Sequence, residues 1–192
     1  MRTIKLFPKK NAIIALVIIL ALTGLKTRGQ DNQWSIDKIP FDSLTVSDIK
    51  ATGNFQTGAL ELRIEFVSNY AQLAKVHFSL GGFEGLGITD CAGRKYKINT
   101  NDDLVGTSGI NEGFKKIDKV VFGDKKFEYF TYVEQEISQA KSKTLVVAIN
   151  KFDKNFKEIK QFHIRTLLSL AYIPKGDGLY AINNIKIDWK SR

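Results

Sequence analysis

The sequence predicts an all-β fold, an antiparallel β-sandwich in which helix is a minor component. Residues 60–67, LELRIEFV, place Leu60, Leu62, Ile64 and Phe66 in alternation with charged side chains. Successive side chains of a strand point to opposite faces, so this strand packs one face and exposes the other to water. About ten similar runs recur at intervals of roughly ten residues with turn signals between them, which is typical of a sandwich.

The composition indicates a single domain after a basic leader. The chain has 192 residues, 43% of them hydrophobic and 26% charged, which is enough for one substantial core. Six of the 29 basic residues precede Gln30, and no acidic residue does. The rest of the chain has 23 basic and 20 acidic residues, so its net charge is +3 rather than the +9 of the whole sequence. This small charge argues against a nucleic-acid partner.

Residues 1–29 have the segment order of a signal peptide: a basic stretch, an apolar run over residues 12–25 and a short polar end. Thr27 and Gly29 are small residues at the third and first positions before a cut that leaves Gln30 as the new N-terminus. A cut after Thr23 has the same spacing. The alternative is a protein tethered to the membrane by an uncleaved N-terminal helix, but the apolar run is shorter than the ~20 residues that span a bilayer.

Export implies a periplasmic or extracellular location. Cys91 is the only cysteine, so it forms no intrachain disulfide, and no cysteine lies at the expected mature N-terminus for lipid attachment. We expect no membrane span once the leader is removed. The mature chain then consists of a tail or edge strand over residues 30–43 and a β-sandwich domain over residues 44–192, which must be stable through core packing alone.

The strands expected in the first half of the domain are residues 44–51, 60–67, 75–80, 88–90 and 95–98. The first is interrupted by Ser47 and Asp48, which predicts an irregularity, and is followed by a turn over residues 53–58. The second and third pair antiparallel if their short connection is a hairpin. The last two form a tight hairpin, because Asp90 and Gly93 suit the first and fourth positions of a type I turn.

The second half begins after a polar loop over residues 99–111. Its expected elements are strands at 117–122, 127–133, 144–152, 157–165 and 179–189, a surface connector with room for one helical turn at 134–143, and a turn at 175–178. The run LVVAI in residues 144–152 is apolar throughout, as a central strand buried on both faces requires. Residues 166–173, TLLSLAYI, fit a buried strand or two helical turns, and the sequence leaves that choice open. The expected core includes Leu60, Leu62, Ile64, Phe66, Val76, Phe78, Leu80, Val146, Ile149, Phe162 and Ile164.

The hairpin sequence ITDCAGRKYKI contains Asp90, Gly93 and Tyr96 and precedes a polar loop and the segment KVVF, which ends at Phe122. In this order it resembles bacterial exported domains of unknown function that have an immunoglobulin-like β-sandwich. The closing segment NNIKIDW is similar to the last strand of such domains. The resemblance implies an immunoglobulin-like sandwich and an exported location, and it implies no activity.

Few residues are candidates for chemistry. His77 and His163 lie on the polar sides of their strands, without a cysteine or carboxylate at metal-ligand spacing. Cys91 lies inside a turn, where we expect an exposed, inert thiol rather than a nucleophile. Asn99, Asn101 and Asp103 alternate as the ligands of a calcium-binding loop do. The glycine and the glutamate that such a loop also requires are absent. We therefore expect no catalytic residue, no metal and no cofactor.

Two groups of charged residues have two interpretations: they are simply exposed to solvent, or they have a function. Glu61 and Glu65 flank Arg63 on one strand face with an i to i+2 spacing of roughly 6.5 to 7 Å, a spacing that suits an acid pair for glycoside hydrolysis. Five lysines are expected on a solvated face or against an anionic glycan or lipid surface: Lys115, Lys116, Lys119, Lys125 and Lys126.

Aromatic residues gather at Phe127, Tyr129, Phe130 and Tyr132. With rings on both faces of a strand, one set is expected in the core and the other partly exposed, where aromatic rings stack on sugars or protein partners. The sequence therefore predicts a non-catalytic binding or structural module of the cell envelope whose partner is an envelope protein or glycan. The alternative is an envelope hydrolase of the glycoside type that uses Glu61 and Glu65.

We expect N-terminal sequencing of the exported protein to begin at Gln30, because Thr27 and Gly29 meet the small-residue requirement of the cut. Intact mass of the same material provides a second measurement. A protein that retains residues 1–29 in the membrane fraction would contradict the prediction.

Overall fold

The computed structural model describes residues 34–38, 44–71, 73–80, 85–98, 114–127, 132–170 and 173–191. These residues form thirteen strands and no helix, which confirms the all-β class and leaves the expected minor helix without a place among them. The strands are β1 (Ser35–Lys38), β2 (Leu44–Asn54), β3 (Leu60–Ser68), β4 (Ala74–Ser79), β5 (Gly87–Thr89), β6 (Lys95–Ile98), β7 (Lys115–Ile117), β8 (Lys119–Phe122), β9 (Lys125–Lys126), β10 (Tyr132–Ile137), β11 (Ser142–Ile149), β12 (Glu158–Leu170) and β13 (Ile173–Lys190).

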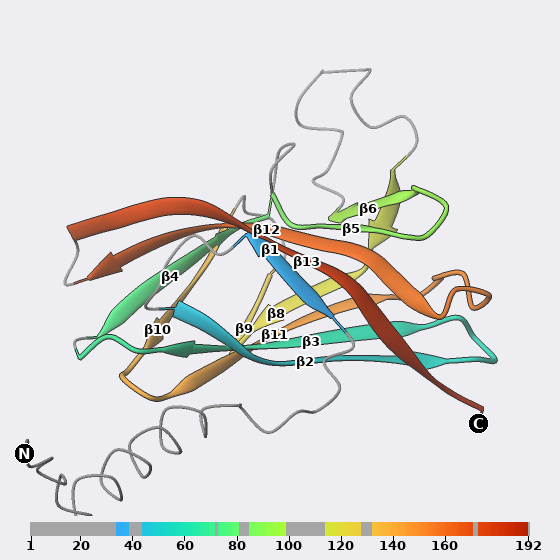
Figure 1. Ribbon diagram of the computed structural model, residues 1–192, viewed down its shortest axis with the longest axis horizontal. Coiled ribbons are helices and arrows are strands. Elements are labelled where there is room, and N and C mark those ends of the chain that lie inside the picture. The colour runs from blue at the N-terminus through green and yellow to red at the C-terminus, as the bar shows by residue number, and fades with distance from the viewer. Residues whose placement is uncertain are drawn as a thin grey trace, which may run out of the picture. The chain divides into compact units, whose positions relative to one another are not determined.

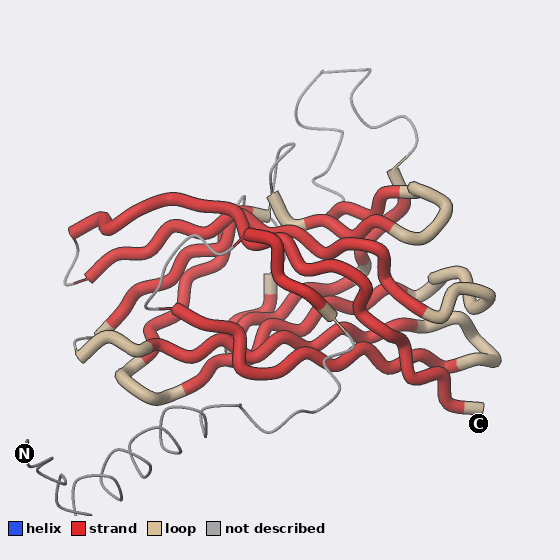
Figure 2. The backbone as a smooth tube through the Cα atoms, in the orientation of Figure 1, coloured by secondary structure: helices blue, strands red, loops and turns tan. Residues whose placement is uncertain are grey.

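The strands belong to one strongly curled mixed sheet, a half-barrel whose two halves face each other (Figures 1 and 2). In one half, β12 pairs with β13, β4 and β5, and β1, β6, β7 and β10 extend from these. In the other half, β11 lies between β3 and β8, with β2 and β9 outside them. The apolar sides of both halves face the space between them, which is the core.

The last strand joins the two halves. β13 pairs antiparallel with β12 from Ile173 to Lys186 and then parallel with β2 from Ile187 to Lys190. Asn184, just before this change of partner, has a φ of 56°, a left-handed conformation that asparagine tolerates better than most residues. We infer that this local irregularity helps β13 to turn from one half toward the other.

The predicted antiparallel sandwich is therefore wrong in its architecture. Two strand pairs, β13 with β2 and β6 with β7, are parallel, and the halves are parts of one sheet rather than two separate sheets. Alternation of apolar and polar residues only shows that one face of a strand is buried. The same alternation occurs in a sandwich and in a curled sheet, so the pattern did not discriminate between the two architectures.

Most of the expected strands occur, and the hairpin over residues 87–98 has the predicted turn. Gly93 has a φ of 78°, and its N–H donates to the carbonyl oxygen of Asp90 at 3.0 Å. The strand β2 has its irregularity between Val46 and Asp48, as predicted. Residues 166–170 continue β12 and Ile173 begins β13, so the open choice between strand and helix is decided in favour of strand for these residues, while residues 171–172 lie outside the described part of the chain.

Three local predictions are wrong. β3 and β4 do not pair with each other, because β4 lies between β10 and β12 in the other half of the sheet. Residues 175–178 belong to β13 instead of forming a turn, and the chain reverses where Leu170 pairs with Ile173. The connector predicted for residues 134–143 is shorter, since β10 extends to Ile137 and β11 begins at Ser142.

The core contains every predicted core residue except Val146. In β11 it is Leu145, Val147 and Ile149 that are buried, and Val146 is half-buried on the outward face. The strand is central, as predicted, because it pairs with both β3 and β8, but its two faces are not equally buried. The register of an apolar run cannot be read from its composition, since each position looks equally suited to the core.

Four aromatic rings connect the two halves across the core. Phe66 of β3 contacts Phe78 of β4 at a centroid distance of 4.9 Å, Phe122 of β8 at 6.3 Å and Tyr180 of β13 at 5.4 Å. Phe78 and Phe122 are 4.5 Å apart. The Tyr180 hydroxyl donates to the carbonyl oxygen of Leu44 at 2.6 Å, which ties β13 to β2.

Replacing Phe66 with Ala should lower the free energy of unfolding by about 3 to 5 kcal/mol, because it removes a buried ring and leaves a cavity between the halves. Chemical denaturation measures this loss. Glu61→Ala on the same strand is the control and should change it by less than about 0.5 kcal/mol, since that side chain faces solvent. Equal losses for the two variants would show that the halves do not depend on this contact.

Candidate functional site

The aromatic stripe predicted as a binding surface is only partly within the described residues. Phe127 is buried, and its N–H donates to the carbonyl oxygen of Val120 at 3.0 Å, so its ring belongs to the core. Tyr132 begins β10, opposite Ser79 of β4. Tyr129, Phe130 and the side chain of Tyr132 lie outside what the structure describes.

A different aromatic surface lies where β2 turns into β3. Phe55, in this turn, is 46% exposed, and its ring meets Trp189 of β13 edge-on at a centroid distance of 6.4 Å and an angle of 85°. The Lys154 ammonium, from the loop between β11 and β12, lies 5.2 Å from the Phe55 ring centroid. We call Phe55, Trp189 and Lys154 the end surface. It combines two aromatic rings with a cation, and its residues come from three separate segments.

Trp189 is held in place from two sides. Its Cα is paired with Gly53 in the parallel β13–β2 ladder, and its six-membered ring lies where a side chain at position 53 would be. Its indole N–H donates to the carbonyl oxygen of Phe156 at 2.7 Å. Because Gly53 has no Cβ, the ring lies close to the β2 backbone. The orientation of Trp189 is therefore fixed before any ligand binds, which reduces the entropy lost on binding.

Residues of the β5–β6 hairpin contact the segment that carries part of this surface. Asp90 is fully buried; its carboxylate accepts the Arg94 Nε–H at 2.6 Å and the Tyr96 hydroxyl at 3.2 Å. Arg94 also donates to Asp153 at 2.9 Å, and its guanidinium lies 5.1 Å from the Phe156 ring centroid. Arg94 in turn lowers the pKa of the Asp153 carboxyl. This network connects the β5–β6 turn to the loop that carries Lys154.

The two histidines lie in different surroundings. His77 of β4 is half-buried, with its Nδ1 3.2 Å from a carboxylate oxygen of Glu134. His163 of β12 lies over Gly87 of β5, and burial, followed by the charges of Lys97 and Lys95, lowers its pKa. Both lie on the outward side of their strands, as predicted, but neither is freely solvated. Within the described part of the chain, no three histidine, cysteine or acidic side chains come together as metal ligands would.

Cys91 is exposed in the turn of the β5–β6 hairpin, as predicted. Its Sγ lies 3.5 Å from the Glu158 carbonyl oxygen. Desolvation, followed by the neighbouring carboxylates of Glu158 and Asp90, raises the pKa of the thiol. A raised pKa leaves less of the thiolate that a nucleophile needs.

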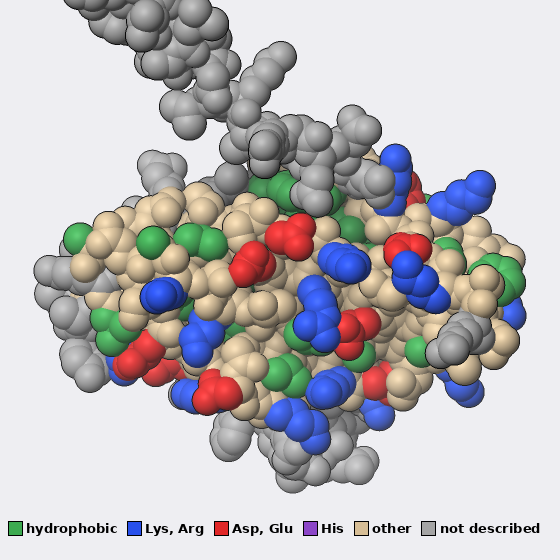
Figure 3. All heavy atoms as spheres, turned by 90° about the horizontal axis from the view of Figure 1, so that it is seen from below, with side chains coloured by type: hydrophobic (Ala, Val, Ile, Leu, Met, Phe, Trp, Pro, Cys, Tyr) green, Lys and Arg blue, Asp and Glu red, His purple; other side chains and the backbone are tan. Residues whose placement is uncertain are grey.

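The carboxylates of Glu61 and Glu65 each contact polar or charged neighbours on the outward face of the sheet. Glu61 lies 2.7 Å from the Arg63 Nε on the outward face of β3. Glu65 accepts hydrogen bonds from Ser142 and Ser47, which lower its pKa. Figure 3 shows the domain from below the view of Figure 1, and here acidic and basic side chains are interspersed rather than gathered by sign.

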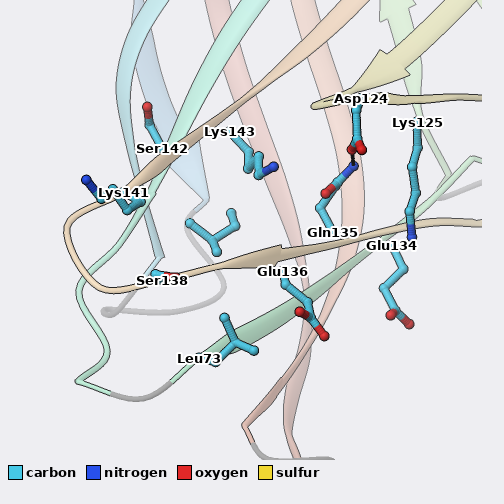
Figure 4. A pocket seen from close by; sticks show the side chains of 11 residues that line it. Leu73, Asp124, Lys125, Glu134, Gln135, Glu136, Ser138, Lys141, Ser142 and Lys143 are labelled. Atoms are coloured by element: carbon cyan, nitrogen blue, oxygen red, sulfur yellow. Dashed lines mark hydrogen bonds between the residues drawn. The ribbon is translucent and has the colours of Figure 1, made fainter.

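An open polar pocket of about 590 Å³ lies beside β10 and β11 (Figure 4). The amide of Gln135, a buried side chain, donates to Asp124 at 2.5 Å and to the carbonyl oxygen of Phe122 at 2.7 Å. Glu134 forms an ion pair with Lys75 at 3.5 Å, and its carboxylate also lies 3.2 Å from Nδ1 of His77. The pocket therefore contains both signs of charge, and its walls are held by contacts among their own side chains. It is lined by Leu73, Asp124, Lys125, Glu134, Gln135, Glu136, Ile137, Ser138, Lys141, Ser142 and Lys143.

Comparison with known proteins does not assign this arrangement to a family. No family model matches the chain, and no curated protein matches it. No helix among the described residues is long and apolar enough to cross a membrane. The predicted signal peptide and the polar loop with Asn99, Asn101 and Asp103 lie outside the described residues, so export remains a prediction.

Sequence reasoning missed Phe55 and Trp189 as a pair because they are 134 positions apart and only the parallel β13–β2 ladder brings them together. Two local signals were present. Phe55 is an aromatic residue inside a predicted turn, and Trp189 ends the NNIKIDW segment in alternation with Ile185 and Ile187. Neither signal identifies the other residue.

Protein stability should fall as pH is lowered from about 7.5 to 5.5, and His163→Gln should reduce this fall. The ordinary histidine pKa is 6.5, and His163 has a lower one in the folded protein, so below pH 6.5 the unfolded chain binds a proton that the folded chain does not. Its contribution is thus complete above pH 6.5 and is lost as pH falls through the folded-state pKa. Urea titrations at several pH values measure the effect, and identical pH profiles for wild type and variant would contradict it.

Proposed function

We propose that this domain is a non-catalytic binding module of the cell envelope that recognises a glycan through the end surface of Phe55, Trp189 and Lys154. The observation that carries the proposal is Phe55, an aromatic ring left 46% exposed at a turn while a second ring and a cation are held against it. A contiguous exposed apolar patch with a polar rim is typical of an interaction site.

The chemistry of this surface suits a sugar. The faces and edges of aromatic rings contact the apolar C–H side of a pyranose, while an adjacent ammonium group supplies a polar contact at the edge of the sugar. Trp189 is fixed by Gly53 and by the Phe156 carbonyl, so little freedom is lost when a ligand binds. A protein loop would meet the same surface, and an envelope protein is the second partner that it suits.

The alternative, a glycoside-type hydrolase, has less support. Such an enzyme needs one carboxylic acid with a raised pKa that protonates the leaving group. The hydrogen bonds from Ser142 and Ser47 shift the pKa of Glu65 in the opposite direction, and Glu61 is paired with Arg63. Both carboxylates also lie on the outward face of β3, whereas the residues that line the pocket of Figure 4 come from other strands.

We expect Phe55→Ala to abolish retention on immobilised envelope glycans while leaving the melting temperature nearly unchanged, because Phe55 is a surface residue. Gly53→Ala should also abolish retention, since its Cβ would displace the Trp189 ring. Glycan-array binding followed by calorimetry with the retained sugars makes the measurement.

Leu73→Ala is the matched control, because Leu73 is 45% exposed but lies by the polar pocket and far along the sheet from the β2–β3 turn. It should bind as wild type does. Retention of the same glycans by wild type and Phe55→Ala would assign recognition to another surface. Release of reducing sugar from the array by the wild-type protein would favour the hydrolase.

A further inference from the structure

A row of basic side chains crosses four neighbouring strands on the outward face of the half that contains β12. His163 of β12 is the Cα partner of Gly87 in β5, Gly87 is the partner of Lys97 in β6, and Lys97 is the partner of Lys116 in β7. Directly paired residues project from the same face of a sheet. We call His163, Lys97 and Lys116 the basic row. Lys95 lies beside it, two residues from Lys97 on the same face.

The backbone in the middle of this row is covered by an imidazole because position 87 is a glycine. A Cβ at Gly87 would come within 2.5 Å of Cε1 and 2.8 Å of Nε2 of His163, so the imidazole extends from β12 over β5. The imidazole thereby lies over β5, the strand between those that carry His163 and Lys97. Gly87 is thus a position where the absence of a side chain brings two basic groups from non-adjacent strands closer together.

The basic groups are near enough to influence one another. The pKa of His163 is lowered by burial and then by Lys97 and Lys95, and the pKa of Lys97 is lowered by burial and then by Lys95. The Lys97 ammonium also lies 4.8 Å from the centroid of the Phe114 ring. Gathering like charges at a surface has a free-energy cost, which an anion bound between them would offset.

The length and composition of the row indicate the kind of anion. Three inter-strand steps of about 4.8 Å make a row of roughly 14 Å, which is longer than one phosphate or carboxylate group. Its cations are ammonium groups, which act as point charges and suit the evenly distributed charge of phosphate, whereas a planar carboxylate gains most from the two-pronged contact of arginine. A linear chain of phosphates satisfies both requirements.

We propose that the basic row binds a linear phosphate-bearing polymer, such as a polyol-phosphate or polyphosphate chain of the cell envelope, across β12, β5, β6 and β7. The phosphates lie along the row, with Lys97 and Lys116 as the principal contacts and the imidazole of His163 as a hydrogen-bond donor. This surface is distinct from the end surface and does not depend on the glycan proposed for it.

Isothermal titration of the mature protein with polyphosphate of defined length tests this proposal, and polygalacturonate of equal charge is the comparison ligand. We expect the wild type to bind polyphosphate at low salt and more tightly than polygalacturonate. Lys97→Gln with Lys116→Gln should weaken polyphosphate binding about tenfold or more and reduce the slope of log affinity against log salt concentration by roughly one per lysine removed.

The control removes the same charge elsewhere. Lys50→Gln with Lys141→Gln changes two exposed lysines in other parts of the sheet and should leave affinity within about twofold of wild type, since screened distant charges contribute little. Lys116→Gln alone changes a fully outward side chain and keeps the test valid if the Lys97 variant melts at a lower temperature. Phe55→Ala should bind polyphosphate as wild type does.

Two results would overturn the proposal. If the control pair weakens binding as much as the Lys97 and Lys116 pair, the affinity reflects net charge rather than this row. If polygalacturonate binds as tightly as polyphosphate, or if the wild type binds neither, the row does not recognise phosphate. Failure of glycan binding by the end surface would change neither outcome, so the two proposals are tested separately.

Discussion

The contact of Phe66 with Phe78, Phe122 and Tyr180 is the interaction on which the rest of this structure depends. The rings come from strands in both halves of the curled sheet, and their centroids lie between 4.5 and 6.3 Å apart. Such contacts supply buried apolar area together with favourable ring geometry, so they stabilise one curvature of the sheet over others. Without them each half would expose its apolar face.

The same curvature creates the end surface. Since the core closes the halves on each other, β13 must leave β12 and reach β2 to complete the sheet, and its last residues then lie parallel to β2. This brings Trp189 over Gly53 and beside Phe55. The buried Asp90 and its partner Arg94 connect the β5–β6 turn to the neighbouring loop, so the surface is supported by a hydrogen-bonded network as well as by the strand ladder.

The two proposed surfaces use glycine in the same way. At Gly53 the missing Cβ admits the Trp189 ring, and at Gly87 it admits the His163 imidazole. In both places a ring from a paired strand lies over the backbone of its neighbour, which fixes its orientation without a deep pocket. This is an economical way for a sheet to present rigid recognition groups, because the rest of the strand continues its hydrogen-bond ladder undisturbed.

The sequence by itself determined most of the strands and, where apolar and polar residues alternate, the side that each one buries. Alternation in residues 60–67 and 75–80, and the Asp90–Gly93 turn, depend on contacts within a few residues, so they are readable from the chain. It also separated the basic N-terminal segment from a nearly neutral remainder.

The tertiary structure decided the pairing of the strands and some of the burial. β4 joins β12 rather than β3, residues 175–178 extend a strand, and Val147 rather than Val146 is buried. Both candidate surfaces belong to this second group, because Phe55 with Trp189, and His163 with Lys97, become neighbours only when distant strands pair, and local periodicity carries no information about pairing partners.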